Sequence, residues 1–322
     1  MPILQVENLR THYFTDEGPV KAADGVSFTL EKGESIGIAG ESGCGKTTVA
    51  MSLMRLIEGG AVVGGKVILE GLSLLDMPMK QFRKITWDKI SLVSQAAMGA
   101  LNPVKTVGSQ IVEAIRLHMD LSKSDAWERT RFLLSQVKVD PLRAKSYPHE
   151  LSGGMKQRVM IAMALACNPQ VVIADEMTTA LDVVTQAQVL QLLIGLQKEL
   201  DLSLIYISHE LSVLGQACDR MIIMYAGKIV EMGPTETVFS EPGHPYTQKL
   251  LSSNMDVHSD CAIPESIPGK PPDLLNPPSG CRFWPRCTVG QTTCETVEPA
   301  LIEIAPNHYV ACDCSKDKEQ GT

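Results

Sequence analysis

The chain has 322 residues and a net charge of -8, from 29 Lys plus Arg against 37 Asp plus Glu. This length allows about two domains and a sizeable buried core. The negative balance excludes a bulk electrostatic attraction to nucleic acid, although it leaves a local basic patch open.

The first residues, MPILQVENLRTHYF, lack a basic region followed by a long apolar segment, and the sequence has no uninterrupted apolar run of about 18 residues. We therefore expect a cytosolic chain that does not itself span a membrane. In such a chain the nine cysteines are better interpreted as thiols or metal ligands than as a disulfide framework.

Residues 3–35 contain two stretches of alternating apolar and polar positions, LQVENL and GVSFTLEKG. This pattern predicts half-buried strands of an antiparallel layer, which GKVILEG at residues 65–71 is expected to join. An irregular turn, THYFTDEGPVKAADG, is predicted between the first two strands. Its Tyr13 or Phe14 could stack on a purine base, or both could be ordinary strand or core aromatics.

The stretch from Ile36 to Val49, IGIAGESGCGKTTV, contains the complete motif G-x-x-x-x-G-K-[ST] between an apolar run and a helix start. Glycine N–H groups can surround phosphate oxygens, Lys46 can reach the outer phosphates, and the Thr47 hydroxyl can bind Mg²⁺. The expected ligand is a nucleoside triphosphate with Mg²⁺. The residues expected to hold it are Gly40, Ser42, Gly43, Cys44, Gly45, Lys46, Thr47 and Thr48. Because many unrelated functions use this loop, it does not identify a reaction.

Two segments follow before residue 150. DKISLVSQ, residues 88–95, predicts a strand that ends at Gln95, whose amide could reach Mg²⁺ or a catalytic water, although a lone glutamine is more often simply exposed. Residues 106–147 have helix-like spacing, which predicts a helical insert at about residues 96–165.

A second glycine-containing helix start occurs in LSGGMKQRVMIAMALACNP, residues 151–169. Ser152, Gly153 and Gly154 precede a run with helical spacing, so their N–H groups can face phosphate. Taken alone, the segment would be better explained as a plain serine-capped helix.

The apolar stretch VVIADE, residues 171–176, predicts a buried parallel strand with two carboxylates at its C-terminal end. Asp175 suits a position at Mg²⁺, and Glu176 could polarise the water that attacks the γ-phosphate. An Asp-Glu pair in this position is otherwise usually the start of a loop.

A helix is predicted over residues 186–200. Its expected core-facing residues are Val189, Leu192, Leu193, Leu196 and Leu200. Residues 202–208 predict another apolar strand, which delivers His209 to the same sheet, although a lone histidine is more often structural than catalytic.

In order and approximate spacing, the motifs resemble those of the ATP-binding subunits of ABC transporters. The motifs are GESGCGKTT, Gln95, LSGGM, VVIADE, ALD at residues 180–182 and His209. The resemblance covers about residues 3–235 and implies an α/β fold, with a P-loop ATPase core, an antiparallel β layer and a helical insert. It implies that Lys46 and Thr47 hold phosphate and Mg²⁺ and that Gln95 joins the metal and the membrane subunit. It also implies that Glu176 activates water and that His209 contacts the γ-phosphate.

The same resemblance identifies contacts beyond the loop. Tyr13 is similar to the adenine-stacking aromatic. Ser152 and Gly154, with Gly153 between them, are similar to the signature contacts made to ATP of the opposing subunit, and Asp182 would lie at the dimer seam. In this family one loop and one signature close on the same nucleotide only across a dimer. The working unit would therefore contain two such subunits, which ATP joins and hydrolysis releases.

The chain changes character after Gly233. EPGHPYTQKLL, residues 241–251, resembles the tail of the di- and oligopeptide importer subgroup, and IPGKPPDLLNPPSG predicts an extended connector. We predict an ATP-binding domain over residues 1–235 and a Pro/Cys-rich C-terminal extension over residues 236–322.

The extension contains four cysteines separated by five, six and seventeen residues: Cys281, Cys287, Cys294 and Cys312. These intervals match neither the C-x₂-C pairs usual for zinc nor the common ferredoxin spacing, so spacing leaves the metal undecided. A similar quartet in the peptide-importer subgroup is associated with a [4Fe–4S] cluster, which the resemblance implies within residues 281–314. Buried thiols and a zinc site are the alternatives. Cys314 could compete with Cys312, whereas Cys261 and Cys44 are not assigned to a metal.

Two residues depart from the family pattern. Met177 stands where the subgroup usually has proline after the Asp-Glu pair, and methionine does not fix φ as proline does. Met155 replaces the glutamine commonest at the end of the signature, a change familiar among peptide importers. Neither departure removes a catalytic side chain.

The combined interpretation is an ATP-hydrolysing subunit of an ABC importer at the cytoplasmic face of the membrane, with di- or oligopeptides as the expected cargo. Its expected partners are a related ATPase subunit, two transmembrane permease subunits and an extracytoplasmic substrate-binding protein, with no nucleic acid. Oligosaccharides or metal chelates are alternative cargoes. A soluble ABC ATPase acting on nucleic acid or ribosomes is the rival function, disfavoured by one compact cassette without inserted coiled coil or zinc modules. A P-loop kinase would not explain LSGGM.

Overall fold

The computed structural model describes residues 1–94, 97–177, 181–253 and 267–313, and the chain forms two compact units. Unit 1 contains Met1, Glu31–Glu34 and Asp76–Tyr206, whereas unit 2 contains Pro2–Leu30, Ser35–Leu75 and Ile207–Thr322. None of the described helices combines the length and the hydropathy that crossing a membrane requires. The predicted division at residue 235 stays a prediction.

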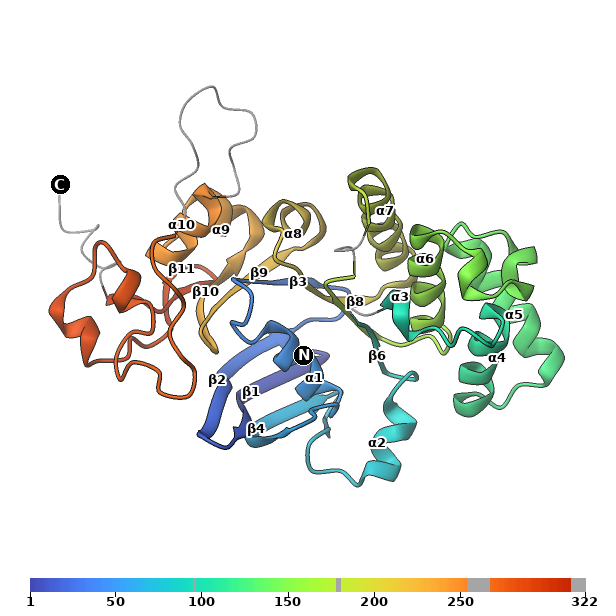
Figure 1. The fold of residues 1–322 in the computed structure, drawn as a ribbon, viewed down its shortest axis with the longest axis horizontal. Helices are drawn as coiled ribbons and strands as arrows, with labels where there is room; N and C mark the ends of the chain where they lie inside the picture. Colours follow the sequence, from blue (N-terminus) through green and yellow to red (C-terminus); the bar gives the residue numbers. More distant parts are fainter. Residues whose placement is uncertain (95–96, 178–180, 254–266, 314–322) are drawn as a thin grey trace. The chain divides into compact units, whose positions relative to one another are not determined.

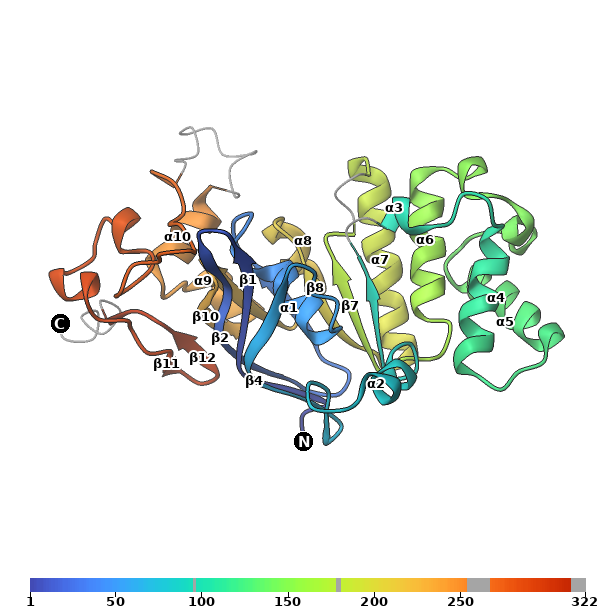
Figure 2. The same cartoon turned by 60° about the horizontal axis from the view of Figure 1, so that its bottom comes forward.

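An antiparallel sheet forms one part of unit 2, in the strand order β2-β1-β4-β5. Figure 2 shows β2, β1 and β4 side by side. Its strands are β1 (Leu4–Thr15), β2 (Gly18–Leu30), β4 (Gly60–Leu69) and β5 (Leu72–Ser73). Leu4, Val6 and Leu9 of β1 are buried, while several residues between them are partly exposed, so one face of the strand packs into the core. The predicted antiparallel layer is confirmed.

The prediction of a long irregular turn between the first two strands is wrong. β1 continues to Thr15 and β2 begins at Gly18, and these two residues pair directly across a tight turn. The pairing register shifts at three places between Val6 and His12. Such bulges break the strict alternation by which a strand is recognised in a sequence, and this explains the error.

The second sheet of unit 2 has the strand order β11-β12-β10-β9-β3. Its strands are β3 (Ser35–Ala39), β9 (Arg220–Tyr225), β10 (Lys228–Pro234), β11 (Ile302–Ala305) and β12 (His308–Val310). β3 and β9 are parallel and the other pairs are antiparallel. The extension thus adds two strands to this sheet, which the sequence did not predict.

Short helices complete unit 2. They are α1 (Lys46–Leu53), α8 (Leu211–Ala217), α9 (Thr235–Ser240), α10 (Pro245–Ser252), η3 (Trp284–Arg286) and η4 (Thr292–Glu295). Residues 267–280 contain neither helix nor strand, as predicted for a connector.

Unit 1 contains neighbouring strands in the order β8-β7-β6, with β6 and β7 parallel. They are β6 (Ile90–Val93), β7 (Val171–Asp175) and β8 (Ser203–Ile207). Every residue of β7 and β8 is buried, as expected for strands covered on both faces. The predicted buried strand VVIADE is therefore confirmed as far as Asp175.

Helices make up most of unit 1, and α4, α5 and α6 lie together in Figure 1. The helices are α2 (Met79–Ile85), α3 (Ala97–Ala100), α4 (Val107–His118), α5 (Lys123–Gln136), η1 (Pro141–Lys145), η2 (Pro148–Glu150), α6 (Gly153–Ala164) and α7 (Val183–Leu200). Four α-helices, α3 to α6, lie in sequence between β6 and β7, where the helical insert is predicted. Side chains of Thr106, Ser122 and Ser152 cap three of them by accepting backbone N–H groups.

The predicted core face of α7 holds for four of its five residues. Val189, Leu192, Leu193 and Leu196 are buried, whereas Leu200 is 45% exposed. Leu200 is the last helical residue and Asp201 next to it has a φ of 53°, so the chain turns away there. The prediction for Leu200 is wrong because the helix ends before that position can enter the core.

Candidate nucleotide site

The glycine-rich motif lies in unit 2 between the buried strand β3 and helix α1. Gly40, Gly43 and Gly45 have φ values of 149°, 79° and 105°, which favour glycine. A Cβ atom would lie 2.2 Å from the Met224 carbonyl oxygen if added at Gly40, and 2.1 Å from the Ala22 carbonyl oxygen if added at Gly45. A Cβ at Gly43 would meet nothing within 4 Å. Gly40 and Gly45 are therefore required because carbonyl oxygens of other strands leave no room for a Cβ atom. At Gly43 only the positive φ favours glycine.

Lys46 begins α1 and is 4% exposed. Its Nζ donates to the carbonyl oxygens of Gly40 at 2.7 Å and Glu41 at 3.1 Å. An ammonium group has three donors, all able to turn toward an entering phosphate oxygen. The loop therefore holds a buried cation beside the N–H groups at the start of α1, an arrangement that favours an anion.

Cys44 fastens the loop to neighbouring strands. Its backbone oxygen accepts from the Gly227 N–H at 2.9 Å, and the Gly227 oxygen accepts from the Asp24 N–H at 2.9 Å. The side chain is buried, and burial raises the pKa of the thiol although Lys46 opposes the shift. Cys44 thus packs as a neutral group while its backbone links the loop to the β9–β10 turn and to β2.

Tyr13 and His209 also lie in unit 2. The Tyr13 hydroxyl lies 3.4 Å from the Thr48 Oγ1 atom, beside the loop, whereas Phe14 is 60% exposed. Ser208 donates its N–H to the Ile38 oxygen in β3 at 3.3 Å, so His209 follows a residue bonded close to the start of the loop. Ser42 and His209 are exposed and Thr47 is half-buried. The structure thus places Tyr13 beside the loop. The roles of Tyr13, Ser42, Thr47 and His209 in nucleotide binding stay predictions.

Unit 1 holds the second glycine-containing helix start. The exposed Ser152 caps α6 through its Oγ atom, which accepts from the Met155 N–H at 3.3 Å. Asp182 caps α7, accepting from the Thr185 N–H at 3.0 Å and from the Thr185 hydroxyl at 2.7 Å. These bonds from Thr185 lower the pKa of Asp182. A Cβ at Gly154 would lie 2.5 Å from the Thr185 Cγ2 atom, so both helix starts meet at Thr185.

The two carboxylates at the end of β7 have different surroundings. Asp175 is fully buried, whereas Glu176 is half-buried and has a left-handed φ of 43°. The turn at Glu176 leads into Met177, which is only 3% exposed. The methionine that replaces the expected proline is therefore a buried apolar residue directly after the turn.

Four predicted or discussed residues lie outside the described part of the chain. They are Gln95, Ala180, Cys261 and Cys314. The predicted contacts of Gln95 with Mg²⁺ and with a membrane subunit therefore stay predictions.

Three of the four predicted cluster cysteines gather in one short segment. The Cys281 N–H donates to the Cys294 oxygen at 2.8 Å. Burial raises the pKa of the Cys281 thiol, and nearby Cys294 and Cys287 add to the shift. Across the described residues, however, no group of three or more His, Cys, Asp or Glu side chains is arranged to hold a metal ion. The donor chemistry suits a thiolate-ligated metal, but the side chains are not assembled as a ligand set.

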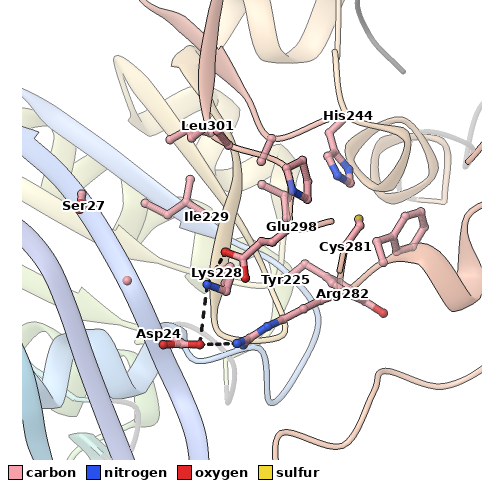
Figure 3. A pocket seen from close by; sticks show the side chains of 16 residues that line it. Asp24, Ser27, Tyr225, Lys228, Ile229, His244, Cys281, Arg282, Glu298 and Leu301 are labelled. Carbon is pink, nitrogen blue, oxygen red and sulfur yellow. Dashed lines mark hydrogen bonds and ion pairs between the residues drawn. The ribbon is translucent and has the colours of Figure 1, made fainter. Parts of the chain in front are cut away.

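A cavity of about 230 Å³ lies between residues of the cysteine segment, β2 and the β9–β10 turn (Figure 3). Its charged side chains pair with one another: Lys228 lies 2.6 Å from Glu298 and 3.7 Å from Asp24, and Arg282 also pairs with Asp24. Burial alone would raise the pKa of Asp24, but Lys228 and Arg282 lower it below its usual value. None of the described residues that line the cavity belongs to the glycine-rich loop, and the ion pairs fasten the extension to β2 and β10.

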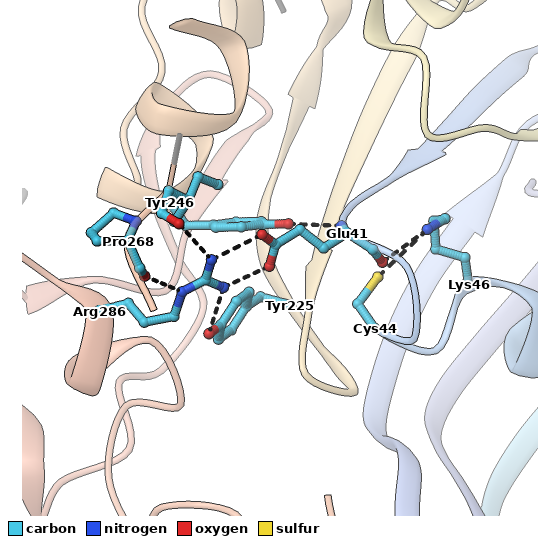
Figure 4. Close-up of polar contacts among 8 residues, drawn as sticks. Glu41, Cys44, Lys46, Tyr225, Tyr246, Pro268 and Arg286 are labelled. Atoms are coloured by element: carbon cyan, nitrogen blue, oxygen red, sulfur yellow. Dashed lines mark hydrogen bonds and ion pairs between the residues drawn. The ribbon is translucent and has the colours of Figure 1, made fainter. Parts of the chain in front are cut away.

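Two residues that support the loop, Tyr246 and Arg286, were not predicted from the sequence. The Tyr246 hydroxyl accepts the Glu41 N–H at 2.9 Å, and Arg286 pairs with the Glu41 carboxylate at 2.6 Å (Figure 4). Arg286 and Glu41 are 245 positions apart, so no local pattern connects them. The available signal was the presence of two arginines among the aromatic and cysteine residues of CRFWPRC.

Two family models match the sequence. The model described as ABC transporter matches residues 23–179, and the model described as oligopeptide/dipeptide transporter, C-terminal region, matches residues 230–294. The first includes the glycine-rich loop, and the second includes three of the four predicted cluster cysteines, Cys281, Cys287 and Cys294.

Curated relatives match along nearly their full length. The probable peptide ABC transporter ATP-binding protein y4tR of Sinorhizobium fredii is 43% identical over 96% of this chain and 94% of its own. The oligopeptide transport ATP-binding protein OppD of Salmonella typhimurium is 42% identical over 96% of this chain and 93% of its own. AppD of Bacillus subtilis, named likewise, is 41% identical over 96% of both chains.

Solved structures also match. The ATP-binding cassette MJ0796, a dimer with ADP and phosphate in a post-hydrolysis state, has a TM-score of 0.66 at 27% identity, covering 72% of this chain and 98% of that one. The cbiO1 protein of Clostridium perfringens, part of an ABC transporter complex, has a TM-score of 0.65 at 27% identity, covering 74% and 91%.

Proposed function

The chain belongs to the ABC transporter family of ATP-binding proteins, and from this premise we propose that it hydrolyses ATP to power the import of di- or oligopeptides. The observation that carries the proposal is one chain with both a complete phosphate loop and a C-terminal region of the oligopeptide/dipeptide type. That region supports a peptide cargo over oligosaccharides, metal chelates and a soluble role on nucleic acid or ribosomes.

ATP binding begins at the loop. The buried ammonium of Lys46 exchanges its carbonyl partners for oxygens of the outer phosphates, while the loop N–H groups bind the others. Thr47, Asp175 and Gln95 are the residues that would hold Mg²⁺, which when bound neutralises charge between the β- and γ-phosphates. Tyr13 stacks on the adenine.

Hydrolysis needs a base and a group that senses the γ-phosphate. Glu176 accepts a proton from the attacking water, and His209 contacts the γ-phosphate. The position of Glu176 supports this role, because it directly follows the buried strand β7, at the end of a parallel strand where ligands bind in open α/β sheets.

The signature surface acts on a second nucleotide. Ser152, Gly153 and Gly154 begin a helix of 12 residues, whose N–H groups and dipole favour phosphate. The exposed Ser152 supports a contact with ATP bound to a related ATPase subunit, and Asp182 beside it would lie at the seam. Two permease subunits and an extracytoplasmic binding protein complete the assembly, with this chain at the cytoplasmic face of the membrane.

The Glu176→Gln variant tests the assignment of the base. In the assembled transporter we expect ATP to bind with near-normal affinity, while turnover falls at least about 100-fold because the proton acceptor is lost. Glu199→Gln, at an exposed position near the end of α7, is the matched control and should turn over normally. Near-normal turnover by Glu176→Gln would contradict the assignment.

We further propose a [4Fe–4S] cluster held by Cys281, Cys287, Cys294 and Cys312. The chemistry of four thiol donors supports it, as does the backbone bond of 2.8 Å from the Cys281 N–H to the Cys294 oxygen. Such a cluster would supply covalent bonds that hold the extension together. Iron and sulfide assay of anaerobically purified protein tests the proposal. Four irons and four sulfides per chain are expected, and zinc without iron would reject the cluster.

A further inference from the structure

Arg286 is a buried arginine in the cysteine segment, 6% exposed, at the end of η3. All five N–H donors of its guanidinium have acceptors. Both terminal nitrogens donate to the Glu41 carboxylate, at 2.6 and 3.0 Å, in a two-armed pair. The remaining donors reach the Tyr225 hydroxyl at 3.3 Å and the oxygens of Pro268 at 2.8 Å and Ile267 at 3.3 Å (Figure 4). No smaller cation could make this set of contacts.

The acceptor of this pair belongs to the phosphate loop. Glu41 directly follows Gly40, and its N–H donates to the Tyr246 hydroxyl at 2.9 Å. Its backbone oxygen accepts from Lys46 Nζ at 3.1 Å and from the Cys44 N–H at 3.2 Å. Arg286 therefore holds the residue whose backbone contacts the phosphate-binding lysine.

Aromatic rings surround the ion pair. The Tyr225 ring centroid lies 4.6 Å from that of Tyr246 and 5.2 Å from that of Phe283, and the Arg286 Cζ atom lies 5.8 Å from the Tyr225 ring. Burial raises the pKa of both tyrosines, so their hydroxyls remain neutral hydrogen-bonding groups. An ion pair with restricted access to water is stronger and more rigid than an exposed one.

Attachment of the extension does not depend on Arg286 alone. Arg282, also buried, pairs with Asp24 and with the Ala226 oxygen, and Lys228 pairs with Glu298. These contacts fasten the same segment to β2 and to the β9–β10 turn. The contact with the loop side chain is therefore an additional function of the segment.

We propose that Arg286 is a positioning residue of the nucleotide site, which fixes the opening of the phosphate loop through Glu41 and so sets the affinity for ATP. The C-terminal cysteine segment is then a working part of that site, 245 positions from the loop it holds. This inference rests on the proposed function, because it takes ATP as the ligand of the loop.

Binding of a fluorescent ATP analogue to the full chain tests the inference. Arg286→Gln and Glu41→Gln should each raise the Kd about tenfold, near the lower limit for a hydrogen bond between charged groups. Arg286→Lys keeps the charge without the two-armed geometry and should give a smaller increase. The double variant should bind no more weakly than Arg286→Gln, because both changes remove one shared interaction. It also leaves no unpaired buried charge, so it serves if a single variant fails to fold.

Two further measurements separate positioning from general stability. In the assembled transporter, Arg286→Gln should raise the KM for ATP about tenfold while kcat stays within about twofold, since saturating ATP restores the loop. Glu298→Gln, which removes an ion pair of 2.6 Å in the same extension, is the matched control and should leave Kd and KM unchanged.

The outcomes are distinct. A wild-type chain that does not bind the analogue contradicts the proposed function itself. If the wild type binds, unchanged Kd values in the Arg286 and Glu41 variants overturn the inference alone. Additive increases in the Kd of the double variant would also overturn it. So would a lower melting temperature of the variants with an unchanged Kd.

Discussion

The phosphate loop in unit 2 and the signature segment in unit 1 are both glycine-containing helix starts, but their surroundings differ. In the loop, Gly40 and Gly45 lie against carbonyl oxygens of other strands, and Lys46 is buried. In the signature segment, Ser152 is exposed and caps its own helix, and the neighbour of Gly154 is a methyl group of Thr185.

This difference separates two ways of binding the same ligand. The loop is built by contacts within one chain, including the pair between Arg286 and Glu41, so its geometry exists before ATP arrives. The signature presents an exposed helix start, which suits a nucleotide held by another subunit. Substitutions should therefore act on folding and ATP affinity at the loop, but mainly on turnover at the signature.

The largest effect is expected for Gly45→Ala compared with Gly43→Ala. Both positions have positive φ, so each alanine costs about 1–2 kcal/mol of backbone strain. Only at Gly45 would the Cβ also overlap a backbone oxygen, at 2.1 Å, which should add about 1–3 kcal/mol. Urea unfolding measures the difference. Equal decreases in the free energy of unfolding of the two variants would contradict the described packing of the loop.

Lys46→Ala should follow in size. Loss of the charged contact with phosphate should weaken ATP binding on the order of 100-fold. The carbonyl oxygens of Gly40 and Glu41 also lose their donor, which should cost about 1–3 kcal/mol of stability. Lys66→Ala, at an exposed position of β4, is the control. Titration with a fluorescent ATP analogue measures both, and wild-type affinity in Lys46→Ala would refute the assignment of the site.

Asp24→Asn tests the anchoring of the turn that supports the loop. The pKa of Asp24 is lowered in the folded chain, so its charge stabilises above the unfolded value of 3.8 and this contribution is lost as pH falls through the folded value. The free energy of unfolding of the variant should therefore be about 1–3 kcal/mol lower than that of the wild type at pH 7. On acidification the variant should lose less further stability than the wild type. Melting curves between pH 7 and pH 3 measure this, and parallel curves for the two proteins would contradict it.

The smallest change in stability is expected for Ser152→Ala. Removal of the cap should cost about 1 kcal/mol, while the isolated chain binds ATP normally and the assembled transporter turns over more slowly. Thr106→Ala, which removes a similar cap from α4, is the matched control and should change stability without changing turnover. Equal turnover in the two variants would argue against a contact between Ser152 and nucleotide.

Features that lie within one contiguous segment of the chain could be predicted from the sequence. The loop, the cap at Ser152 and the two carboxylates at the end of β7 each lie within one contiguous segment, where spacing and residue type indicate the chemistry. Bulges hid the full length of β1 and β2, because alternation is lost where the register shifts. The pair between Arg286 and Glu41 was out of reach, since tertiary folding alone brings these positions together.

Gly154→Asp tests the central claim, that the loop binds ATP within the chain while the signature serves a second subunit. A carboxylate at the start of α6 would repel phosphate there. We expect the isolated variant to bind ATP with unchanged affinity, while the assembled transporter loses at least about tenfold in ATP turnover. Weakened ATP binding by a folded isolated chain, or wild-type turnover in the transporter, would contradict it.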